Sequence, residues 1–150
     1  MIRSAVSMGA LPKLSDTLNW LPIDVVARVV AELCHSREHR DVYHVVNPKS
    51  FNWSADLLPM LRNAGLDFEP VTPQEWLERL ASSDPDPAVN PTIKLLEFFK
   101  TKYAVSNRGP AVKFETDTTE RESQTLRTVG APDAALIGKM VEFWKTEGWQ

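Results

Sequence analysis

The stretch from Leu18 to Leu33, LNWLPIDVVARVVAEL, constrains the fold more than any other part of the sequence. Pro22 suits the first turn of a helix, because the amide hydrogen that it lacks would have no partner there. Asp24 in that turn can accept hydrogen bonds from unpaired amides and meets the positive end of the helix dipole. The apolar residues that follow at helical spacing are Val25, Val26, Val29, Val30 and Leu33. The stretch therefore predicts a buried amphipathic helix that begins near Pro22.

Other segments also carry helical signals, and the clearest of them is a capping box. In TPQE, Thr72 is the predicted N-cap, Pro73 takes the first helical position and Glu75 stands three residues after the cap. In the segment that ends at Gly65, Pro59 predicts a kink or a late helix start. The helices predicted besides 22–33 cover residues 2–8, 50–65, 73–81, 93–103, 117–126 and a last segment that begins at Pro132-Asp133.

Short extended segments alternate with these helices. VYHVV, residues 42–46, is a nearly continuous β-branched run, typical of a strand that is covered on both faces. DFEPV is a second predicted strand, in which Pro70 favours an edge position. Residues 17–21 and 112–116 are further extended candidates. The pattern predicts a mixed α/β fold, mainly helical with a few short strands, in which residues 1–150 form a single domain.

Composition excludes several classes of function. Of the 150 residues, 43% are apolar and 25% are charged, as in soluble globular proteins. The net charge of −3 favours neither nucleic acid nor an anionic membrane as partner. No apolar run approaches the roughly 20 residues of a membrane-spanning helix. The single cysteine, Cys34, indicates a reducing, cytoplasmic setting, and a buried thiol is expected there.

No catalytic constellation emerges from the residues themselves. HSREH, residues 35–39, matches the H-x-x-E-H pattern of inverted zinc peptidases, but it lies between a helix and a predicted strand, so a polar connection is favoured. His44 alternates into that strand and is interpreted as a hydrogen-bonded core histidine. The glycines form no dinucleotide-binding or phosphate loop. We therefore assign no catalytic, cofactor-binding or metal-ligating residue.

Several segments, taken in order, resemble the C-terminal, substrate-binding portion of thioester reductase domains of the extended short-chain dehydrogenase/reductase superfamily. Such domains occur in fungal non-ribosomal peptide and polyketide synthases and in carboxylic acid reductases. The segments are IRSAVSMGALP, LNWLPIDVVARVVAEL, VYHVVNPKSFNWSADLLPMLRNAGLDFEPVTPQEWLERL, NPTIKLLEFFK and FETDTT…SQTLR. The Trp-x-Pro-x-Asp core, Trp20 to Asp24, is the most specific of these features.

The resemblance implies a role in releasing an acyl or peptidyl chain from a carrier protein. In the family, NADPH reduces the thioester on the phosphopantetheine arm to an aldehyde or, after a second round, to an alcohol, while some relatives cyclise the product instead. The N-terminal Rossmann half, with the NADPH loop and the catalytic Tyr and Lys, has no counterpart here, so the chain is expected to be an inactive substrate-side piece. The residues implied to face the substrate are Met8, Leu11, Trp20, Leu96 and Phe99, and helix 93–103 is the candidate lid.

Two other interpretations stay open beside this one. The chain can instead be a stand-alone interaction module that binds a carrier protein or another partner. The other alternative is the HSREH zinc hydrolase. If the missing half covers a sheet edge beside residues 42–46, the isolated chain is also expected to expose apolar surface and to self-associate.

Overall fold

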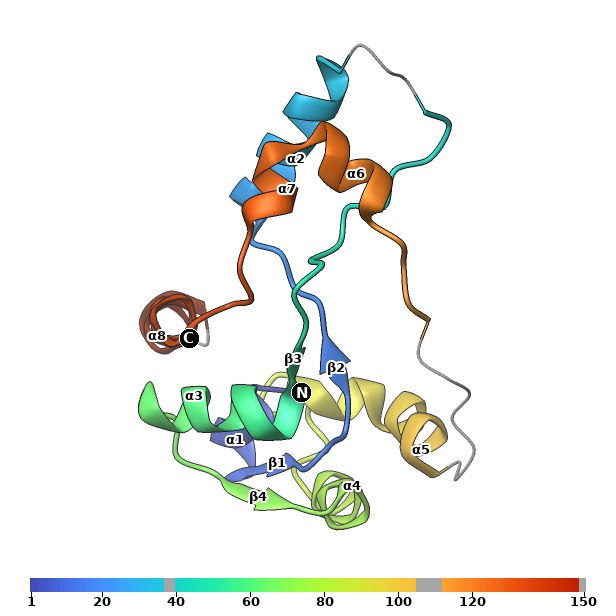
Figure 1. Ribbon diagram of the computed structural model, residues 1–150. Coiled ribbons are helices and arrows are strands. Elements are labelled where there is room, and N and C mark those ends of the chain that lie inside the picture. Colours follow the sequence, from blue (N-terminus) through green and yellow to red (C-terminus); the bar gives the residue numbers. More distant parts are fainter. Residues whose placement is uncertain (37–39, 105–111, 149–150) are drawn as a thin grey trace. The chain divides into compact units, whose positions relative to one another are not determined.

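The computed structural model describes residues 1–36, 40–104 and 112–148 and divides the chain into two compact units (Figure 1). The first unit comprises Met1–Asp16, Trp53–Pro110 and Ala134–Gln150, and the second comprises Thr17–Asn52 and Ala111–Asp133. Both are mainly helical with very short strands, which confirms the predicted mixed α/β class. Because each unit is built from segments far apart in the sequence, its packing depends on long-range contacts.

The first unit is organised around two short parallel strands. The strand β1 (Ala10–Pro12) pairs with β4 (Glu69–Val71), with Leu11 opposite Pro70. Gly9 links the short helix α1 (Ser4–Ser7) to β1 and has a φ of +63°, which glycine adopts without steric cost. All three residues of β1 are buried, so this strand forms the centre of the unit rather than its edge.

Helices surround this pair of strands. A π-helical turn (Trp53–Leu57) leads into α3 (Leu58–Asn63), and α3 packs against α8 (Ala134–Phe143), which ends in a second π-helical turn (Trp144–Gly148). The helix α4 (Pro73–Ala81) packs on β1 and on α5 (Leu96–Ala104), which follows a 3-10 turn (Pro91–Leu95). The largest fully buried apolar side chains of this unit are Leu11, Leu57, Leu61, Trp76, Leu80, Ile137 and Val141.

The second unit packs three helices against one another beside a two-stranded antiparallel ladder. The strand β2 (Thr17–Leu18) pairs with β3 (Phe51–Asn52). The helix α2 (Ile23–Cys34) packs on α6 (Asp117–Glu122) and α7 (Gln124–Thr128). Their shared core consists of Val29, Leu33 and Leu126, with Leu21, Val25, Tyr43, Val45 and Val129 against it. Within the described residues, none of the helices combines the length and apolar character that a bilayer crossing requires.

The helix boundaries follow the sequence signals closely where a cap is encoded. The helix α4 covers the predicted residues 73–81, and the Thr72 hydroxyl accepts a hydrogen bond from the Glu75 amide at 3.2 Å. The helix α2 begins directly after Pro22, as predicted. Asp24 was expected to accept hydrogen bonds from amides of the first turn, but its carboxylate forms an ion pair with Arg28 at 2.9 Å. Of the two outcomes predicted at Pro59, a kink or a late helix start, the structure shows the second, because α3 begins at Leu58 with Pro59 in its first turn.

Several predictions for the extended segments were wrong. Residues 42–46 form no strand, because none of the described segments pairs with them; Val45 instead packs on the core of the second unit. His44 is consequently exposed rather than a core histidine, and its Nδ1 lies 3.0 Å from the carbonyl oxygen of Glu115. The candidate strand near residue 114 is likewise irregular.

Cys34 is exposed because it occupies the outer face at the end of α2, so the expected burial was wrong.

Three predicted helices differ in their geometry. The segment before Pro59 is a π-helical turn, and the segment before Leu96 is a 3-10 turn. The helix predicted over residues 117–126 is interrupted at Ser123, whose backbone is extended. The Ser123 hydroxyl then caps α7 by accepting a hydrogen bond from the Leu126 amide at 3.0 Å. A capping residue thus divides one predicted helix into two.

Candidate functional site

The strand β1 is fixed in the first unit by two buried indole groups. The Ser4 hydroxyl donates to the carbonyl oxygen of Ala10 at 3.0 Å and accepts from Trp76 Nε1 at 2.9 Å. At the other end of the strand, Trp53 Nε1 donates to the carbonyl oxygen of Pro12 at 2.7 Å. Ser4, Trp53 and Trp76 are all buried. These contacts join α1, β1, α4 and the turn before α3, so they define where the residues on β1 can lie.

An aromatic cluster connects this centre to α5. The Trp76 ring meets the Phe99 ring edge-on at a centroid distance of 5.1 Å, and Phe99 stacks on Tyr103 at 5.9 Å. Edge-on and offset contacts of this kind stabilise aromatic pairs beyond the area they bury. One face of α5 is therefore packed on α4, whereas Phe98 on the other face is 57% exposed.

The five residues predicted to face a substrate divide between the two units. Met8, at the end of α1, and Leu96, at the start of α5, are half-buried. Leu11 is fully buried in β1, and Phe99 is only 5% exposed. Trp20 belongs to the second unit, where it is half-buried and meets the Phe51 ring edge-on at 5.6 Å. Four of the five thus share the unit in which α4 contacts both β1 and α5, and their role in binding stays a prediction.

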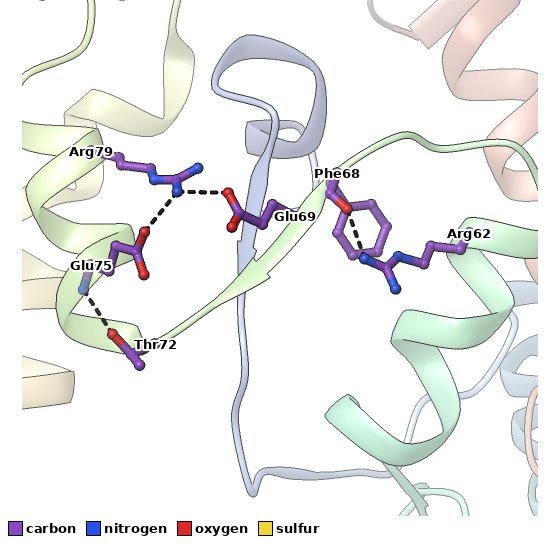
Figure 2. A network of polar contacts seen from close by, with 6 residues as sticks. All are labelled: Arg62, Phe68, Glu69, Thr72, Glu75 and Arg79. Carbon is purple, nitrogen blue, oxygen red and sulfur yellow. Dashed lines mark hydrogen bonds and ion pairs between the residues drawn. The ribbon is translucent and has the colours of Figure 1, made fainter.

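Polar contacts hold β4 between two helices (Figure 2). From α4, Arg79 Nη2 lies 2.7 Å from both Glu69 of β4 and Glu75 of its own helix, and these carboxylates raise the pKa of the Arg79 guanidinium, that of Glu69 most. From α3, Arg62 donates to the carbonyl oxygen of Phe68 at 3.1 Å and lies over the Phe68 ring at 5.2 Å from its centroid. Sequence reasoning missed this network, although the spacing of four residues between Glu75 and Arg79 is a readable helix signal.

In the second unit, two carboxylates accept hydrogen bonds from hydroxyl groups. Glu32 of α2 accepts from the hydroxyls of Ser123 and Thr125, each at 2.5 Å. These bonds, that of Ser123 first, hold the pKa of the Glu32 carboxyl below its usual range. The contacts join α2 to α7 and leave no carboxylate oxygen of Glu32 without a partner, which indicates a structural role.

Glu122 of α6 likewise contacts Ser36, Arg40 and Tyr43. It accepts a hydrogen bond from the Tyr43 hydroxyl at 2.5 Å and from the Ser36 hydroxyl at 2.8 Å, with Arg40 Nε at 3.9 Å. The Tyr43 bond is the main cause that lowers the pKa of Glu122, and it raises the pKa of Tyr43. Both carboxylates are therefore ionised near neutral pH and serve as acceptors.

The histidine pattern that suggested a metal site is only partly described. His35 is exposed, and its Nδ1 lies 2.8 Å from the carbonyl oxygen of Ala31, while Glu38 and His39 fall outside the described residues. No three His, Cys, Asp or Glu side chains in the described part of the chain converge to hold a metal ion. The described residues also contain no glycine-rich loop that would cradle a dinucleotide.

Comparison with known proteins gives consistent matches in fold and in sequence. The structure superposes on the terminal R domain of the myxalamid PKS-NRPS biosynthetic pathway with a TM-score of 0.74 and 23% identity, covering 99% of this chain and 38% of that one. A non-ribosomal peptide synthetase of Acremonium egyptiacum is 32% identical over 99% of the chain. The citrinin polyketide synthase of Monascus ruber is 29% identical over the same share, and a non-reducing polyketide synthase of Hypocrea jecorina is 31% identical. No protein-family model matches the chain.

The matched relatives are much longer than this chain. It spans 14% of the Acremonium egyptiacum synthetase and 6% of each of the two polyketide synthases. The comparisons confirm the resemblance predicted from the sequence: the chain has the fold of part of a terminal reductase domain, and its sequence is similar to segments of fungal non-ribosomal peptide and polyketide synthases.

Proposed function

We propose that this chain is the substrate-side subdomain of a release domain that reduces a carrier-protein-bound acyl or peptidyl thioester with NADPH. The observation that supports this most is the similarity in fold over 99% of the chain to a terminal R domain. The synthases that match in sequence add support, since they are named for peptide and polyketide synthesis. The proposal treats residues 1–150 as one subdomain in a cytoplasmic setting.

In this proposal the chain binds and orients the acyl-pantetheine substrate, and it supplies no reacting group. NADPH, held by another part of the domain, would supply a hydride to the thioester carbonyl carbon; with one proton, the pantetheine sulfur would leave as the thiol and an aldehyde would remain. A second hydride and a proton give the alcohol, whereas a parent domain that cyclises its product would consume no NADPH. Neither the cofactor loop nor a Tyr-x-x-x-Lys pair is present in this sequence, so the 150-residue chain is expected to be inactive alone.

The five predicted substrate residues would act in two ways. Met8, Trp20 and Leu96 are half-buried and keep surface with which to contact an acyl chain. Leu11 and Phe99 have almost no exposed surface. They would therefore act indirectly, by holding in place the neighbouring side chains that contact the acyl chain. Substitution of a residue in the first group should therefore weaken binding with little loss of stability, and substitution in the second group should do both.

Binding of an acyl-phosphopantetheine by the isolated chain tests the proposal. Octanoyl-pantetheine and an octanoylated carrier protein are titrated against the chain by calorimetry, and NADPH oxidation is followed at the same time. We expect binding without turnover, and a loss of several-fold in affinity for Met8→Ala. Met140→Ala is the matched control, because Met140 is also half-buried but lies on α8. Equal affinity of all three proteins, or NADPH oxidation by the chain alone, would refute the proposal.

An interaction module is the second candidate, and the exposed apolar side chains favour it. Ile23 is 82% exposed, and Phe98 and Phe143 are each 57% exposed. Exposed apolar side chains mark interaction sites where they form a contiguous patch. Such surface fits either self-association or a protein partner. Light scattering across a concentration series, with and without an acyl-free carrier protein, separates the two. A partner that binds equally well without its acyl-pantetheine arm would favour the module over the release subdomain.

A further inference from the structure

A shallow cleft in the first unit is lined by two cationic residues and by several apolar ones. Its volume is about 300 Å³, and it lies between α3 and the strands β1 and β4. Lys13, which follows β1, and Arg62 of α3 carry the positive charges. The residues that line the cleft are Lys13, Ser54, Leu58, Pro59, Arg62, Asn63 and Pro70. None of the five residues proposed to face the acyl substrate is among them.

Neither cation has a carboxylate counter-ion among the described residues. In the part of the chain that the structure describes, no carboxylate lies within 4.0 Å of the Lys13 amine or the Arg62 guanidinium. Glu69 is close to Arg62 in the sequence, but it is paired with Arg79 at 2.7 Å on the other side of β4 (Figure 2). Lys13 and Arg62 are the charged residues that line the cleft, and Arg62 also lines a neighbouring hollow together with Asp67 and Glu69.

Arg62 is held in a fixed orientation that suits an anion. It donates to the carbonyl oxygen of Phe68 and lies over the Phe68 ring, so only part of its five-donor guanidinium is used within the protein. A guanidinium fixed in this way loses little conformational entropy when it binds a carboxylate or phosphate. Lys13 makes no described side-chain contact and can turn toward the same ligand.

The apolar residues that line the cleft favour a ligand with an aliphatic chain. Leu58 is buried, and Pro59 and Pro70 present ring carbons rather than polar groups to the cavity. The Ser54 hydroxyl is already engaged with the amide and carbonyl of Leu14, at 2.8 and 2.6 Å. The polar groups open to a ligand in this cleft are therefore the two cations and the Asn63 amide, and Leu58, Pro59 and Pro70 provide apolar contact area.

We propose that this cleft binds a small amphiphilic anion, with its carboxylate or phosphate head between Lys13 and Arg62 and its aliphatic chain on Leu58, Pro59 and Pro70. This inference does not rest on the proposed reductase function, because the cleft lies within one unit and shares no residue with the proposed substrate wall. Two classes of ligand carry such an anionic head group on an aliphatic chain, namely carboxylic acids and phosphate monoesters.

Calorimetric titration of the whole chain with octanoate, octyl phosphate, 1-octanol, acetate and inorganic phosphate tests the site. At least one of the two octyl anions should bind at least tenfold more tightly than octanol, acetate and inorganic phosphate, and affinity should fall as salt is raised. The tighter of the octyl anions identifies the head group. If octanol binds as well as the anions, if the short anions bind as well as the octyl ones, or if no octyl anion binds, the proposal is overturned.

Substitutions then locate the binding. Lys13→Gln and Arg62→Gln should each weaken the tighter octyl anion about tenfold, since each removes a charge-assisted hydrogen bond. Lys139→Gln on α8 is the matched control, because it removes one exposed lysine of the same unit and should leave affinity unchanged. If Arg62→Gln disturbs the fold by losing its contact with Phe68, Lys13→Gln still decides the matter. Unchanged affinity in Lys13→Gln would overturn the proposed site.

Discussion

Removal of the Ser4 hydroxyl is expected to destabilise the first unit strongly, although the substitution deletes only one oxygen atom. That oxygen donates to the carbonyl oxygen of Ala10 and accepts from Trp76 Nε1, and both Ser4 and Trp76 are fully buried. Each intramolecular hydrogen bond contributes about 1 kcal/mol net, and a buried donor left without a partner costs about 1–3 kcal/mol. Ser4→Ala should therefore lower the free energy of unfolding by about 2–4 kcal/mol.

Urea unfolding followed by far-ultraviolet circular dichroism measures this loss, and amide hydrogen exchange in β1 and α4 assigns it to the first unit. For a domain of this size, the change corresponds to a fall in Tm of roughly 4–16 °C. Ser15→Ala is the matched control, because Ser15 is exposed and makes no described hydrogen bond; it should change stability by less than about 0.5 kcal/mol.

A double-mutant cycle separates the lost hydrogen bond from the lost volume. Trp76→Phe removes the donor, so in the Ser4→Ala, Trp76→Phe double variant no indole N–H remains unsatisfied. The double variant should be more stable than the sum of the single losses predicts, by about 1 kcal/mol or more. Additive losses, or a cost for Ser4→Ala no larger than that for Ser15→Ala, would show that Ser4 does not hold β1 as its contacts indicate.

Three further perturbations follow from single contacts. Thr72→Ala removes the acceptor for the Glu75 amide, so thermal unfolding should show a loss of about 1 kcal/mol, with Thr72→Ser close to the parent. Gly65→Ala places a Cβ at a φ of +87° and 3.1 Å from Lys145 Nζ, and should cost about 1 kcal/mol or more in the same assay. The lowered pKa of Glu32 means that its stabilising effect is complete above the pKa of the unfolded carboxyl, about 4.3, and is lost as pH falls through the lower folded value. Glu32→Gln should flatten the acid limb of the stability profile, and an unchanged limb would contradict the assignment.

The parts of the fold that were predictable are those in which a local pattern is sufficient. The boundaries of α4 follow from Thr72, Pro73 and Glu75, since a cap and a proline define a helix start within one turn. The start of α2 follows from Pro22 in the same way. These signals act over three or four residues, and distant partners do not alter them.

The segment 42–46 shows why the strands were harder to predict. A β-branched run favours an extended backbone, but a strand also requires a second segment to pair with, and the run does not indicate which segment that is. The observed ladders are β1 with β4 and β2 with β3, and each contains only two or three residues. Two of these strands, β4 and β2, lie in segments that were predicted to be extended, but ladders of two or three residues are too short to indicate which strands pair.

The candidate binding residues show the same limit at the level of the site. Lys13 and Arg62 are separated by nearly fifty residues, and nothing in either local sequence indicates that they line one cleft. The same holds for Glu32, whose hydroxyl partners lie 91 and 93 residues further along the chain. Both arrangements arise because each unit is assembled from separate segments. Side chains that are proposed to bind a ligand, and those that join the segments within one unit, therefore depend on tertiary pairing, whereas helix starts depend only on neighbouring residues.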